Sequence, residues 1–472
     1  MTTPSTENDI ELLAHLMRRA GFGSTYSELK KMSQNSYEKN VSILVNPKET
    51  DWMGDYLVRR FDQEASGMIN APGSARRWIY RMITSDTPLR EKMTLFWHGI
   101  FATGVPKVIN GRVLSDQIDM IRSVGLSRLD DILLHLAKDP AMLVWLDNQE
   151  NHKDAVNENW GRELLELFSM GVGNYSEDDV KQCAKAFTGW TIGNAEYMMV
   201  RAKRDSDWPY GRIAYHFEFD EDDHDTGKKK FLGTQGDLDG GDIIQLICKK
   251  ESTARFISRQ MYHFFVEDEV PVPSWNEIPP KDTEAIEFLT RIYFESDHSI
   301  SVMLTELFNS NFFKSKIKSH TKVKGPAEFA VGVMKLSGEF EIPSRDMIPI
   351  YRQIGWMGQE LNNPPSVEGW HEGTEWIDTG ALIERVNFAS ERIGSPKSHG
   401  ITKLVGDIEA YLDGDTNPSK SLEACLLHMG IVHLSEKTHN ALLEYIKSIE
   451  PGCKRLRDLV RMIGSTKEYQ LS

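Results

Sequence analysis

Hydrophobic residues recur at helical spacing along most of the chain. In the stretch "NDIELLAHLMRRAGFG" (8–23), several apolar residues share one helical face, and Gly21 follows them as a stop signal. The stretch "TPLREKMTLFWHGIF" (87–101) starts with Pro88 at a favoured first helical position and is apolar nearly all round, which is typical of a buried helix. Because this period dominates the other segments too, the pattern predicts an all-α fold with helix–loop–helix packing.

One segment breaks the helical period. In "RIAYHFEFD" (212–220), apolar and polar residues alternate, which is the pattern of a half-buried β-strand. The stretch "KKKFLG" (228–233) follows after a turn and can return beside this strand. The sequence therefore predicts one small β-hairpin insert near 212–233 within the helical protein.

The chain divides by composition rather than by a clear linker. Its 472 residues show no internal repeat and no long low-complexity tract. We expect residues 8–393 to form one large helical domain, because aromatic and apolar helical segments recur throughout them. Residues 394–472 keep the helical pattern with fewer aromatic side chains. We expect this part to be a C-terminal helical extension that packs on the main domain.

The net charge argues against nucleic acid as a partner. With 55 basic and 70 acidic residues the chain carries a formal charge of −15, whereas nucleic-acid-binding proteins usually present a basic stripe. The longest basic run, "KSKIKSHTKVK" (314–324), is typical of a solvated loop, with an anion-binding patch as the alternative. We therefore expect no nucleic-acid partner.

Cysteine usage and hydropathy indicate a soluble protein. The four cysteines form no Cys-x-x-Cys pair, so neither a zinc ribbon nor a disulfide framework is predicted. The first residues lack a basic segment followed by an apolar run, so no signal peptide is visible. No stretch approaches the roughly 20 consecutive apolar residues of a membrane span. We therefore expect no membrane span and a cytoplasmic location.

The stretch "NENWGRELLELFSMGVGNYSEDDV" (157–180) carries the strongest candidate chemistry. Residues 157–170 predict an amphipathic helix with a polar edge, on which Arg162 can pair with Glu158 or Glu166. Partial burial beside a like charge can separate the pKa values of two carboxylates, as acid/base catalysis requires, and a histidine from elsewhere would complete a metal site. A helix with ordinary ion pairs explains the same pattern. The polar edge consists of Asn157, Asn159, Arg162, Glu163 and Glu166.

His98 is the second candidate. It lies in "LFWHGIF" (95–101), where the surrounding aromatic residues favour a desolvated imidazole. As a functional residue it would face the Glu163 helix and act as a base or a metal ligand. The alternative is a core histidine that is hydrogen-bonded to a carbonyl group.

The acidic turn "FDEDDHDTGKKKFLG" (219–233) is the third candidate. Four acidic residues precede His224, and three lysines follow Gly227. The spacing is not that of an EF-hand, but oxygen ligands beside a histidine could hold a hard divalent cation at His224 and Asp225. The alternative is a solvated turn whose acidic and basic side chains pair with one another.

The loop "PPSVEGWHEGTEW" (364–376) is the fourth candidate. Its Trp370 and Trp376 could stack on a sugar or on a partner peptide, and the alternative is that they pack the loop onto the body of the protein. Several common enzyme signatures are missing from the sequence, namely the G-x-S-x-G elbow, the P-loop, H-E-x-x-H and the dinucleotide glycine fingerprint.

Taken together, these segments resemble the bacterial DUF 1800 family, a domain of unknown function. The resemblance covers roughly residues 12–393 and rests on six motifs in one order, among them "LREKMTLFWHGIFATG", "HFEFDEDDHDTGKKKFLG" and "NNPPSVEGWHEGTEWIDTGALIERVNFA". The positions that match the family pattern are His98, Asn157, Glu158, Asn159, Arg162, Glu163, His224, Asp225, Gly227 and Lys229.

The resemblance implies positions but no reaction, because the family has no established activity. The residue types fit a polar pocket for metal-assisted or acid/base hydrolysis of a polar, carbohydrate-like substrate. In this hypothesis Glu163 is a base or metal ligand, Arg162 fixes a polar group and His98 shuttles a proton. A divalent metal at His224 and Asp225 is the implied cofactor. The expected substrate-binding residues are Asn157, Asn159, Glu166, Lys229, Trp370 and Trp376.

A rival hypothesis is a non-catalytic scaffold. Genes of DUF 1800 proteins often neighbour genes of the sulfatase-like DUF 1501 family, which implies a sulfatase-like partner. In that case Trp370 and Trp376 would form the contact and the charged residues would stiffen the core. Many members of the family carry export signals, whereas none is visible in this sequence.

Overall fold

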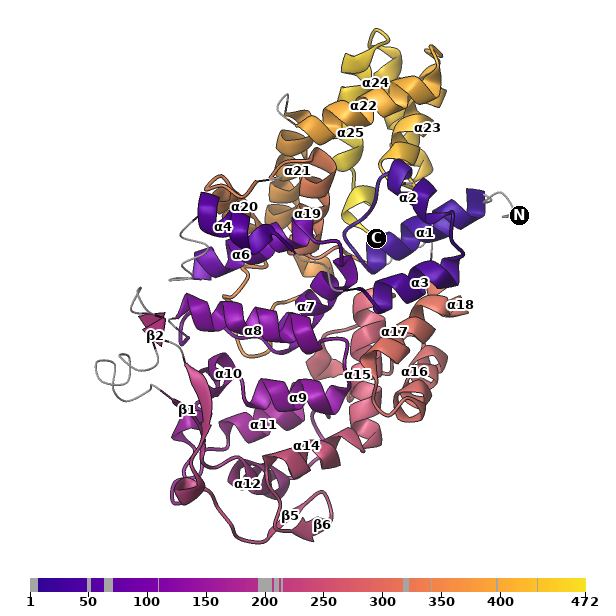
Figure 1. The fold of residues 1–472 in the computed structure, drawn as a ribbon. Helices are drawn as coiled ribbons and strands as arrows, with labels where there is room; N and C mark the ends of the chain where they lie inside the picture. Colours follow the sequence, from indigo (N-terminus) through magenta and orange to yellow (C-terminus); the bar gives the residue numbers. More distant parts are fainter. Residues whose placement is uncertain are drawn as a thin grey trace.

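The computed structural model describes most of the chain as packed helices. The described residues are 7–48, 52–62, 71–108, 110–193, 206–207, 212–213, 215–316, 322–340, 342–395, 398–430 and 432–472. Within them, strands occur only as three antiparallel two-stranded sheets. The prediction of an all-α fold with a small β insert is confirmed (Figure 1).

The first third of the chain is entirely helical where it is described. Pro88 occupies the first turn of its helix, as predicted. The Ser36 side chain accepts a hydrogen bond from the Lys39 amide and so caps the third helix. The elements are α1 (Glu7–Arg19), α2 (Tyr26–Met32), α3 (Tyr37–Val45), α4 (Gly54–Phe61), α6 (Ala71–Thr84), α7 (Pro88–Ile100), α8 (Gly111–Val124), α9 (Leu129–Ala137) and α10 (Pro140–Trp145).

The middle of the chain contains the strands and the candidate helix. A capping box formed by Ser176 and Asp179 starts α12, because each side chain binds the other residue's amide. The elements are η1 (Asn148–Glu150), α11 (Asn159–Glu166), α12 (Glu177–Ala186), β1 (Trp190–Gly193), β2 (Ser206–Asp207), β3 (Arg212–Ile213), β4 (His216–Phe219), η2 (Glu221–Asp223), β5 (Lys229–Phe231), β6 (Thr234–Gly236), α14 (Gly240–Cys248), α15 (Glu251–Phe265), η3 (Val272–Ser274), α16 (Thr283–Glu295), α17 (Ile300–Asn309) and α18 (Asn311–Lys314).

The last third returns to helices. Pro326 and Pro418 each lie in the first turn of a helix, where proline fits because that turn needs no amide donor. The elements are α19 (Pro326–Ser337), α20 (Met347–Trp356), η4 (Gly373–Ile377), α21 (Thr379–Gly394), α22 (His399–Leu412), α23 (Pro418–His428), α24 (Glu436–Lys447), α25 (Cys453–Gly464) and η5 (Glu468–Gln470).

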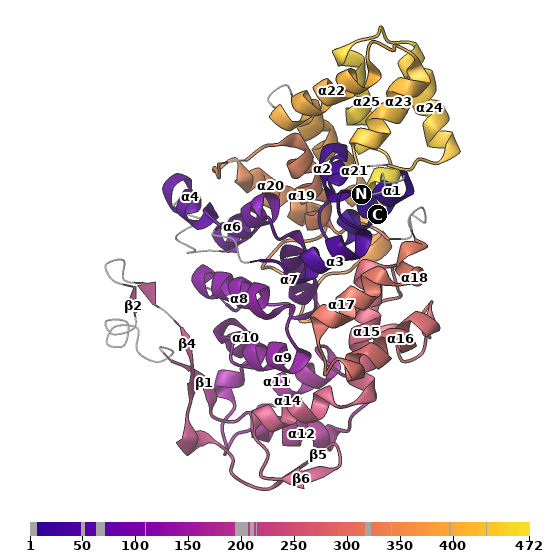
Figure 2. The same ribbon diagram turned by 45° about the vertical axis from the view of Figure 1, so that its right-hand side comes forward.

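Two large apolar cores lie along an elongated molecule. Figures 1 and 2 show α22–α25 at one end and the β5–β6 hairpin at the other. One core gathers side chains of α1, α3, α9, α11, α12 and α14–α17, and the second gathers those of α6 and α19–α25. Helix α7 serves both, because Phe96 and Trp97 belong to the first core and Leu95 to the second. This position explains why α7 is apolar nearly all round.

The strands pair differently from the predicted hairpin. Strand β4 pairs with β1, with Trp190 opposite Phe219 and Ile192 opposite Phe217, whereas β5 pairs with β6. The segments 212–220 and 228–233 are therefore both extended in part, but they do not pair with each other. The Trp190 and Phe217 rings, whose centroids are 5.2 Å apart, favour the β1–β4 pairing.

The C-terminal segment shares its core with earlier helices. Val460 and Ile463 of α25 belong to the same buried cluster as Trp78 of α6 and Phe388 of α21. The last residue is also hydrogen-bonded to the segment before α19, because the Ser472 amide donates to the Lys322 carbonyl oxygen at 2.9 Å. None of the described helices combines the length and hydropathy that a bilayer crossing requires.

Candidate functional site

Helix α11 presents its polar edge at the margin of the first core. It ends at Glu166 rather than near residue 170, because Ser169 turns its hydroxyl back onto the Leu164 carbonyl oxygen at 2.5 Å. Trp160 and Leu164 are buried, and Glu163 beside them is half-buried. The apolar stripe and the polar edge therefore lie as the sequence predicts.

Arg162 is held by neighbours that lie away from the other carboxylates of α11. Its guanidinium donates to both carboxylate oxygens of Glu177 at 2.7 and 2.9 Å and to Glu158 at 3.4 Å. The predicted partner Glu158 is confirmed, but Glu166 instead accepts from the Tyr175 hydroxyl at 2.9 Å. Glu177 opens α12, so the ion pair joins the two helices.

Glu163 is the least compensated carboxylate of this edge. Among the described residues, no side chain forms a hydrogen bond or ion pair with it. Burial raises the pKa of Glu163 to about 7. The negative charges of Glu166 and Glu368 raise this pKa further, and together they have a larger effect than Arg162, which lowers it. A carboxyl group with this pKa can donate and accept protons at neutral pH. The approach of Glu368 also brings the 364–376 loop beside α11.

Asn157 and Asn159 organise the loop before α11. The Asn157 amide donates to the Asn151 side chain at 2.9 Å, and its own side-chain oxygen accepts from the Asn159 amide at 3.0 Å. The Asn157 side-chain nitrogen donates to the Asp147 carbonyl oxygen at 3.3 Å. These bonds fix the loop; a role of either side chain in substrate binding stays a prediction.

His98 is buried between tryptophans. Its Nε2 atom accepts a hydrogen bond from the Asn362 amide at 3.3 Å, and its ring lies 5.1 Å from those of both Trp78 and Trp370. Complete burial lowers the pKa of His98 to about 3, so the imidazole is neutral at physiological pH. The imidazole therefore acts as a hydrogen-bond acceptor in the core, behind Trp370.

The His224 turn is closed by its own hydrogen bonds. His224 donates from Nδ1 to the Thr188 carbonyl oxygen at 2.8 Å, and the Asp225 amide donates to the Thr188 hydroxyl at 2.8 Å. Lys229 is buried and donates to the carbonyl oxygens of Asp225 and Gly227. This arrangement is that of a structural turn, and substrate binding by Lys229 stays a prediction.

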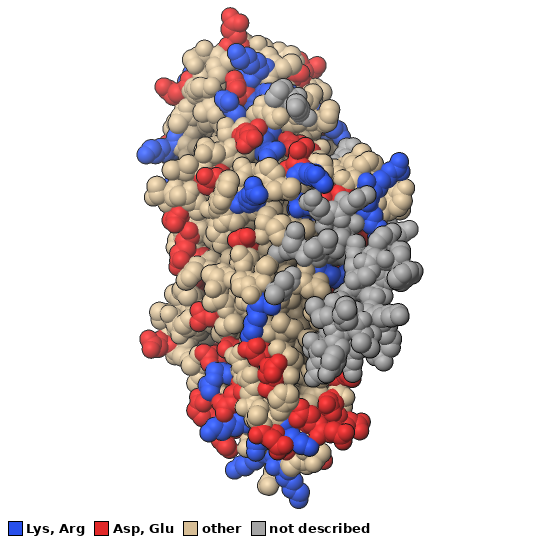
Figure 3. Space-filling view, turned by 90° about the vertical axis from the view of Figure 1, so that its left-hand side faces the viewer, with Lys and Arg blue, Asp and Glu red and all other residues tan. Residues whose placement is uncertain are grey.

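The acidic side chains around this turn are solvated and partly paired. Figure 3 shows acidic residues gathered at the lower end of one face, with basic residues among them. Asp223 pairs with His152 at 2.5 Å and accepts from the Lys153 amide at 3.2 Å. Within the described part of the chain, no three His, Cys, Asp or Glu side chains converge in a way that could hold a metal ion. A metal at His224 and Asp225 thus stays a prediction that this geometry does not support.

The tryptophans of the 364–376 loop pack inward. Trp370 is 9% exposed and Trp376 is 5% exposed, and both join Val323 in a small apolar cluster. Gly369 has a φ of +87°, and a β-carbon there would lie 2.5 Å from the Gly99 carbonyl oxygen. Only glycine permits this approach, which fixes the loop against the end of α7.

Below this loop lies a cavity of about 420 Å³. The end of α7, the end of α15, residues 268–275 and residues 366–375 enclose it. Its size is in the range of small-molecule sites, and its wall combines aromatic rings with convergent polar groups. The lining includes Phe96, Leu167, His263, Phe264, Trp275, Glu368, Trp370 and Glu372.

A histidine–carboxylate pair opens on this cavity. His263 Nε2 lies 2.6 Å from a carboxylate oxygen of Glu372, while His263 Nδ1 accepts from the Glu269 amide at 2.8 Å. Because an imidazole nitrogen that accepts an amide carries no proton, the neutral ring is protonated at Nε2 and donates to Glu372. His263 therefore has no free nitrogen. Its N–H fixes the orientation of the carboxylate of Glu372, whose side chain is 31% exposed. The second oxygen of this carboxylate lies near Gly99, which also lines the cavity.

The other carboxylates of the wall are neutralised. Asp268 pairs with Lys322 at 2.7 Å and accepts the Val323 amide at 2.8 Å, which keeps the pKa of Asp268 low despite its burial. Glu269 pairs with Arg259 at 2.7 Å. Both residues shape the 268–275 segment. The other cavity carboxylates, Glu368, Glu372 and Glu375, have no lysine or arginine partner within the described residues, and Glu375 lies 3.3 Å from His371.

The structure brings together only some of the predicted residues. Trp370 lines the cavity and His98 packs against Trp370, whereas Glu163 does not line the cavity and is linked to it only by the charge of Glu368, which raises its pKa. Arg162 is bound to Glu177, and the His224 turn is bound to Thr188.

Sequence reasoning missed the pair at the centre of the cavity. His263 lies in the apolar helical pattern of "QMYHFFV" (260–266), and Glu372 lies between the two tryptophans that drew attention to their loop. The one sequence feature that points to a site here is the adjacent His371 and Glu372 in "GWHEGTEW" (369–376).

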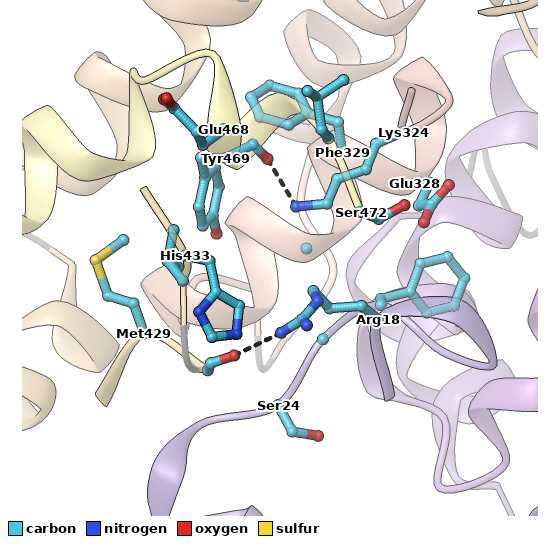
Figure 4. A pocket seen from close by; sticks show the side chains of 16 residues that line it. Arg18, Ser24, Lys324, Glu328, Phe329, Met429, His433, Glu468, Tyr469 and Ser472 are labelled. Atoms are coloured by element: carbon cyan, nitrogen blue, oxygen red, sulfur yellow. Dashed lines mark hydrogen bonds between the residues drawn. The ribbon is translucent and has the colours of Figure 1, made fainter. Parts of the chain in front are cut away.

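A second cavity, near both chain ends, is too small for a substrate. Its volume is about 60 Å³, which is room for one or two water molecules. Figure 4 shows that Arg18 and Lys324 point to main-chain oxygens, with hydrogen bonds of 2.9 Å to Gly430 and 2.7 Å to Tyr469. These cations serve the packing of the C-terminal segment.

The comparisons with known proteins give a family without an activity. The chain matches the family model described as "Protein of unknown function (DUF1800)" over residues 15–471, and it therefore belongs to that family. The match includes the residues beyond 393. No curated protein and no solved structure gave a significant match.

Proposed function

We propose that this member of the DUF1800 family hydrolyses a neutral, polar, carbohydrate-like substrate in the 420 Å³ cavity. The observation that carries the proposal is Glu372, a carboxylate oriented by His263 at 2.6 Å and directed at an aromatic-lined cavity. Glu163 of α11, the helix whose last residues reach the cavity at Leu167, would supply the second carboxyl group. A pair of carboxyl groups with different protonation states is the minimum set for acid/base hydrolysis of a glycosidic bond.

Each carboxyl group has one role. Glu372 accepts the His263 N–H, which orients the carboxyl group either to take the proton of the attacking water or to attack the sugar carbon itself. Glu163 has a pKa of about 7 and donates its proton to the oxygen of the departing group. If Glu372 acts as the base, one proton moves from water to Glu372 and one from Glu163 to the leaving group, and exchange with solvent restores both groups. If Glu372 attacks the sugar carbon, Glu163 protonates the leaving group and then takes a proton from the water that hydrolyses the glycosyl ester of Glu372, which restores both groups.

The composition of the wall supports a substrate without negative charge. Trp275 is partly exposed and offers an apolar face suited to a sugar ring, and the buried Phe96 and Trp370 form the apolar wall behind it. Glu368, Glu372 and Glu375 have no lysine or arginine partner in the described part of the chain and outnumber the one lining lysine, Lys281, whose Nζ donates to the Asp268 carbonyl oxygen, so the wall would repel an anion. His98 serves in this scheme by holding Trp370 in place, because its buried, neutral ring cannot shuttle a proton at physiological pH.

A panel of aryl glycosides tests the proposal. We expect release of the aryl group from at least one neutral glycoside, and a loss of about 10²- to 10⁴-fold in kcat for Glu372→Gln and Glu163→Gln. His263→Gln should lower kcat less than Glu372→Gln, because it removes only the orientation of that carboxylate. Glu295→Gln, an exposed glutamate of α16, is the matched control and should retain full activity.

Two results would contradict the proposal. One is the absence of hydrolysis across neutral α- and β-linked glycosides. The other is an activity that Glu372→Gln and Glu163→Gln leave unchanged while circular dichroism confirms their fold.

The scaffold hypothesis gains no comparable support. It assigns the contact to Trp370 and Trp376, whose side chains are buried in the body of the protein. A sulfatase-like DUF 1501 partner therefore stays a prediction, to be tested by co-purification of the two proteins.

A further inference from the structure

Another depression, much larger than the two cavities described above, lies between the N-terminal helices and the C-terminal helices. Its volume is about 1520 Å³, and it shares no lining residue with the 420 Å³ cavity. Helices α1–α3 form one side, and α22 with the end of α23 forms the other. We call it the α2–α22 groove. It exceeds the usual size of a small-molecule site, so an extended ligand fits it better than a single small molecule.

Three rings from three helix ends form a wall of the groove. Tyr26 begins α2, Tyr411 lies in the last turn of α22, and His428 ends α23. The His428 ring centroid lies 5.2 Å from that of Tyr26 and 5.1 Å from that of Tyr411. The rings of Tyr26 and Tyr411 also meet each other edge-on. Tyr411 is 56% exposed, although the same helix buries its apolar side chains. An exposed aromatic ring that is held by its neighbours is a preformed surface for the C–H face of a sugar.

Neutral hydrogen-bonding groups follow the same groove. The side chains of Ser27, Gln34 and Asn35 line it and are exposed, and none of them forms a hydrogen bond within the described residues. His428 donates from Nδ1 to the Ala424 carbonyl oxygen at 2.8 Å, which leaves the Nε2 of the neutral ring as an acceptor. Hydroxyl and amide groups of this kind match the hydroxyl groups of a sugar chain in both donor and acceptor capacity.

The charges of the groove are nearly balanced. Lys30 and Lys31 stand against Asp9, Glu38 and Asp407 along its lining. A polyanion would meet the carboxylates and a polycation would meet the lysines, so neither gains a uniform field. Balanced charge, an exposed tyrosine ring held edge-on by its neighbours, and unbonded amide side chains together favour a neutral polymer.

We propose that the α2–α22 groove binds a neutral oligosaccharide chain, separately from the hydrolytic cavity. The groove would hold a polymer on the surface while another segment of it, or of a neighbouring chain, enters the cavity. The binding claim stands on the groove alone. It holds or fails whether or not the cavity proves to be hydrolytic.

Calorimetric titration with cellohexaose, xylohexaose and maltohexaose tests the proposal. The protein would carry Glu372→Gln, so that no turnover disturbs the titration. We expect at least one hexasaccharide to bind, and Tyr411→Ala and Tyr26→Ala to weaken that binding about tenfold or more, since each removes a stacking surface. Tyr56→Ala is the control, because Tyr56 on α4 is 54% exposed and lies outside the groove.

The outcomes separate the two sites. Binding that survives in the Glu372→Gln protein and is lost in Tyr411→Ala supports the groove, even if no aryl glycoside is hydrolysed. Failure of all three hexasaccharides to bind would overturn the inference. Equal affinity of the wild type and folded Tyr411→Ala, or tighter binding of the anionic hexamer of galacturonic acid than of any neutral one, would also overturn it.

Discussion

Burial acts in opposite directions on the two titratable groups that the sequence singled out. It raises the pKa of Glu163 to about 7, because the charged carboxylate loses hydration, and it lowers the pKa of His98 to about 3, because the charged imidazolium loses hydration. At neutral pH Glu163 therefore exchanges protons and His98 does not. The carboxylic acid, rather than the histidine, is the group suited to proton transfer.

Glu163 should make the protein less stable as pH rises. Its folded pKa of about 7 lies above the ordinary value of 4.5, so the folded state holds a proton that the unfolded state releases. The stabilisation is present below pH 4.5 and is lost between pH 4.5 and 7. Because Glu163 is only half-buried, we expect about 1 kcal/mol after solvent screening. Urea unfolding of the wild type and Glu163→Gln at pH 5 and pH 8 measures this; an equal difference at both pH values would contradict it.

His98 should destabilise the fold at acidic pH. Its folded pKa of about 3 lies below the ordinary 6.5, so its contribution is present above pH 6.5 and is lost as the pH falls towards 3. NMR of the imidazole protons should show no titration of His98 between pH 5 and 8. His98→Leu removes the acceptor of the Asn362 amide and should cost about 1–3 kcal/mol in urea unfolding.

The contact between α11 and α12 depends on a glycine. A β-carbon at Gly161 would lie 3.1 Å from the Ala184 amide nitrogen and 3.2 Å from the Val180 carbonyl oxygen, both main-chain atoms of α12. Gly161→Ala should therefore separate the helices and lower the free energy of unfolding by about 1–3 kcal/mol. Helix propensity alone predicts the opposite sign, a gain of up to about 1 kcal/mol.

A matched glycine isolates the packing effect. Gly406 lies within α22, and a β-carbon there meets no atom within 4 Å. Gly406→Ala should stabilise the protein by up to about 1 kcal/mol in thermal or urea unfolding. If Gly161→Ala stabilises the protein as much as Gly406→Ala does, the claim that α11 and α12 are in close contact at Gly161 is wrong.

Helices could be predicted from the sequence because their signals are local. The start of α7 at Pro88 and the start of α12 after Ser176 follow from capping chemistry within a few residues. The partner of β4 could not be predicted in this way. Trp190–Gly193 follows a helix stop and is short, so only the tertiary contact of Trp190 with Phe217 identifies it as a strand.

The candidate site could be predicted only in part for the same reason. The polar edge of α11 is a local pattern, and the half-buried Glu163 lies where that pattern places it. The pair of His263 and Glu372 joins residues that are 109 positions apart. No spacing rule connects them, and the tautomer that orients Glu372 depends on a main-chain amide of Glu269.

One half-buried carboxylate connects elements from both ends of the chain. Glu328 of α19 pairs with Lys92 of α7 at 2.7 Å and attracts the buried Arg19 and Arg385 and the half-buried Lys324. Arg19 is 1% exposed, and within the described residues none of its guanidinium nitrogens has a hydrogen-bond partner. Glu328 is therefore the anion that these four cations share, although Asp268 and Glu267 also attract Arg19. Because several cations share one anion, removing the anion and removing one cation should change the free energy of unfolding by different amounts.

Removal of the anion should cost more than removal of a cation. Glu328→Gln keeps the side-chain shape and an oxygen that can still accept the Gly325 amide, but it removes the shared counter-charge of Lys92, Lys324 and Arg385, so we expect a loss of about 3–5 kcal/mol. Lys92→Met leaves Glu328 with the other cations and relieves their mutual repulsion, so the loss should stay below about 2 kcal/mol. Urea unfolding at pH 7 compares the two variants. Equal losses, or a larger loss for Lys92→Met, would mean that Glu328 is not the common counter-charge of α1, α7 and α21.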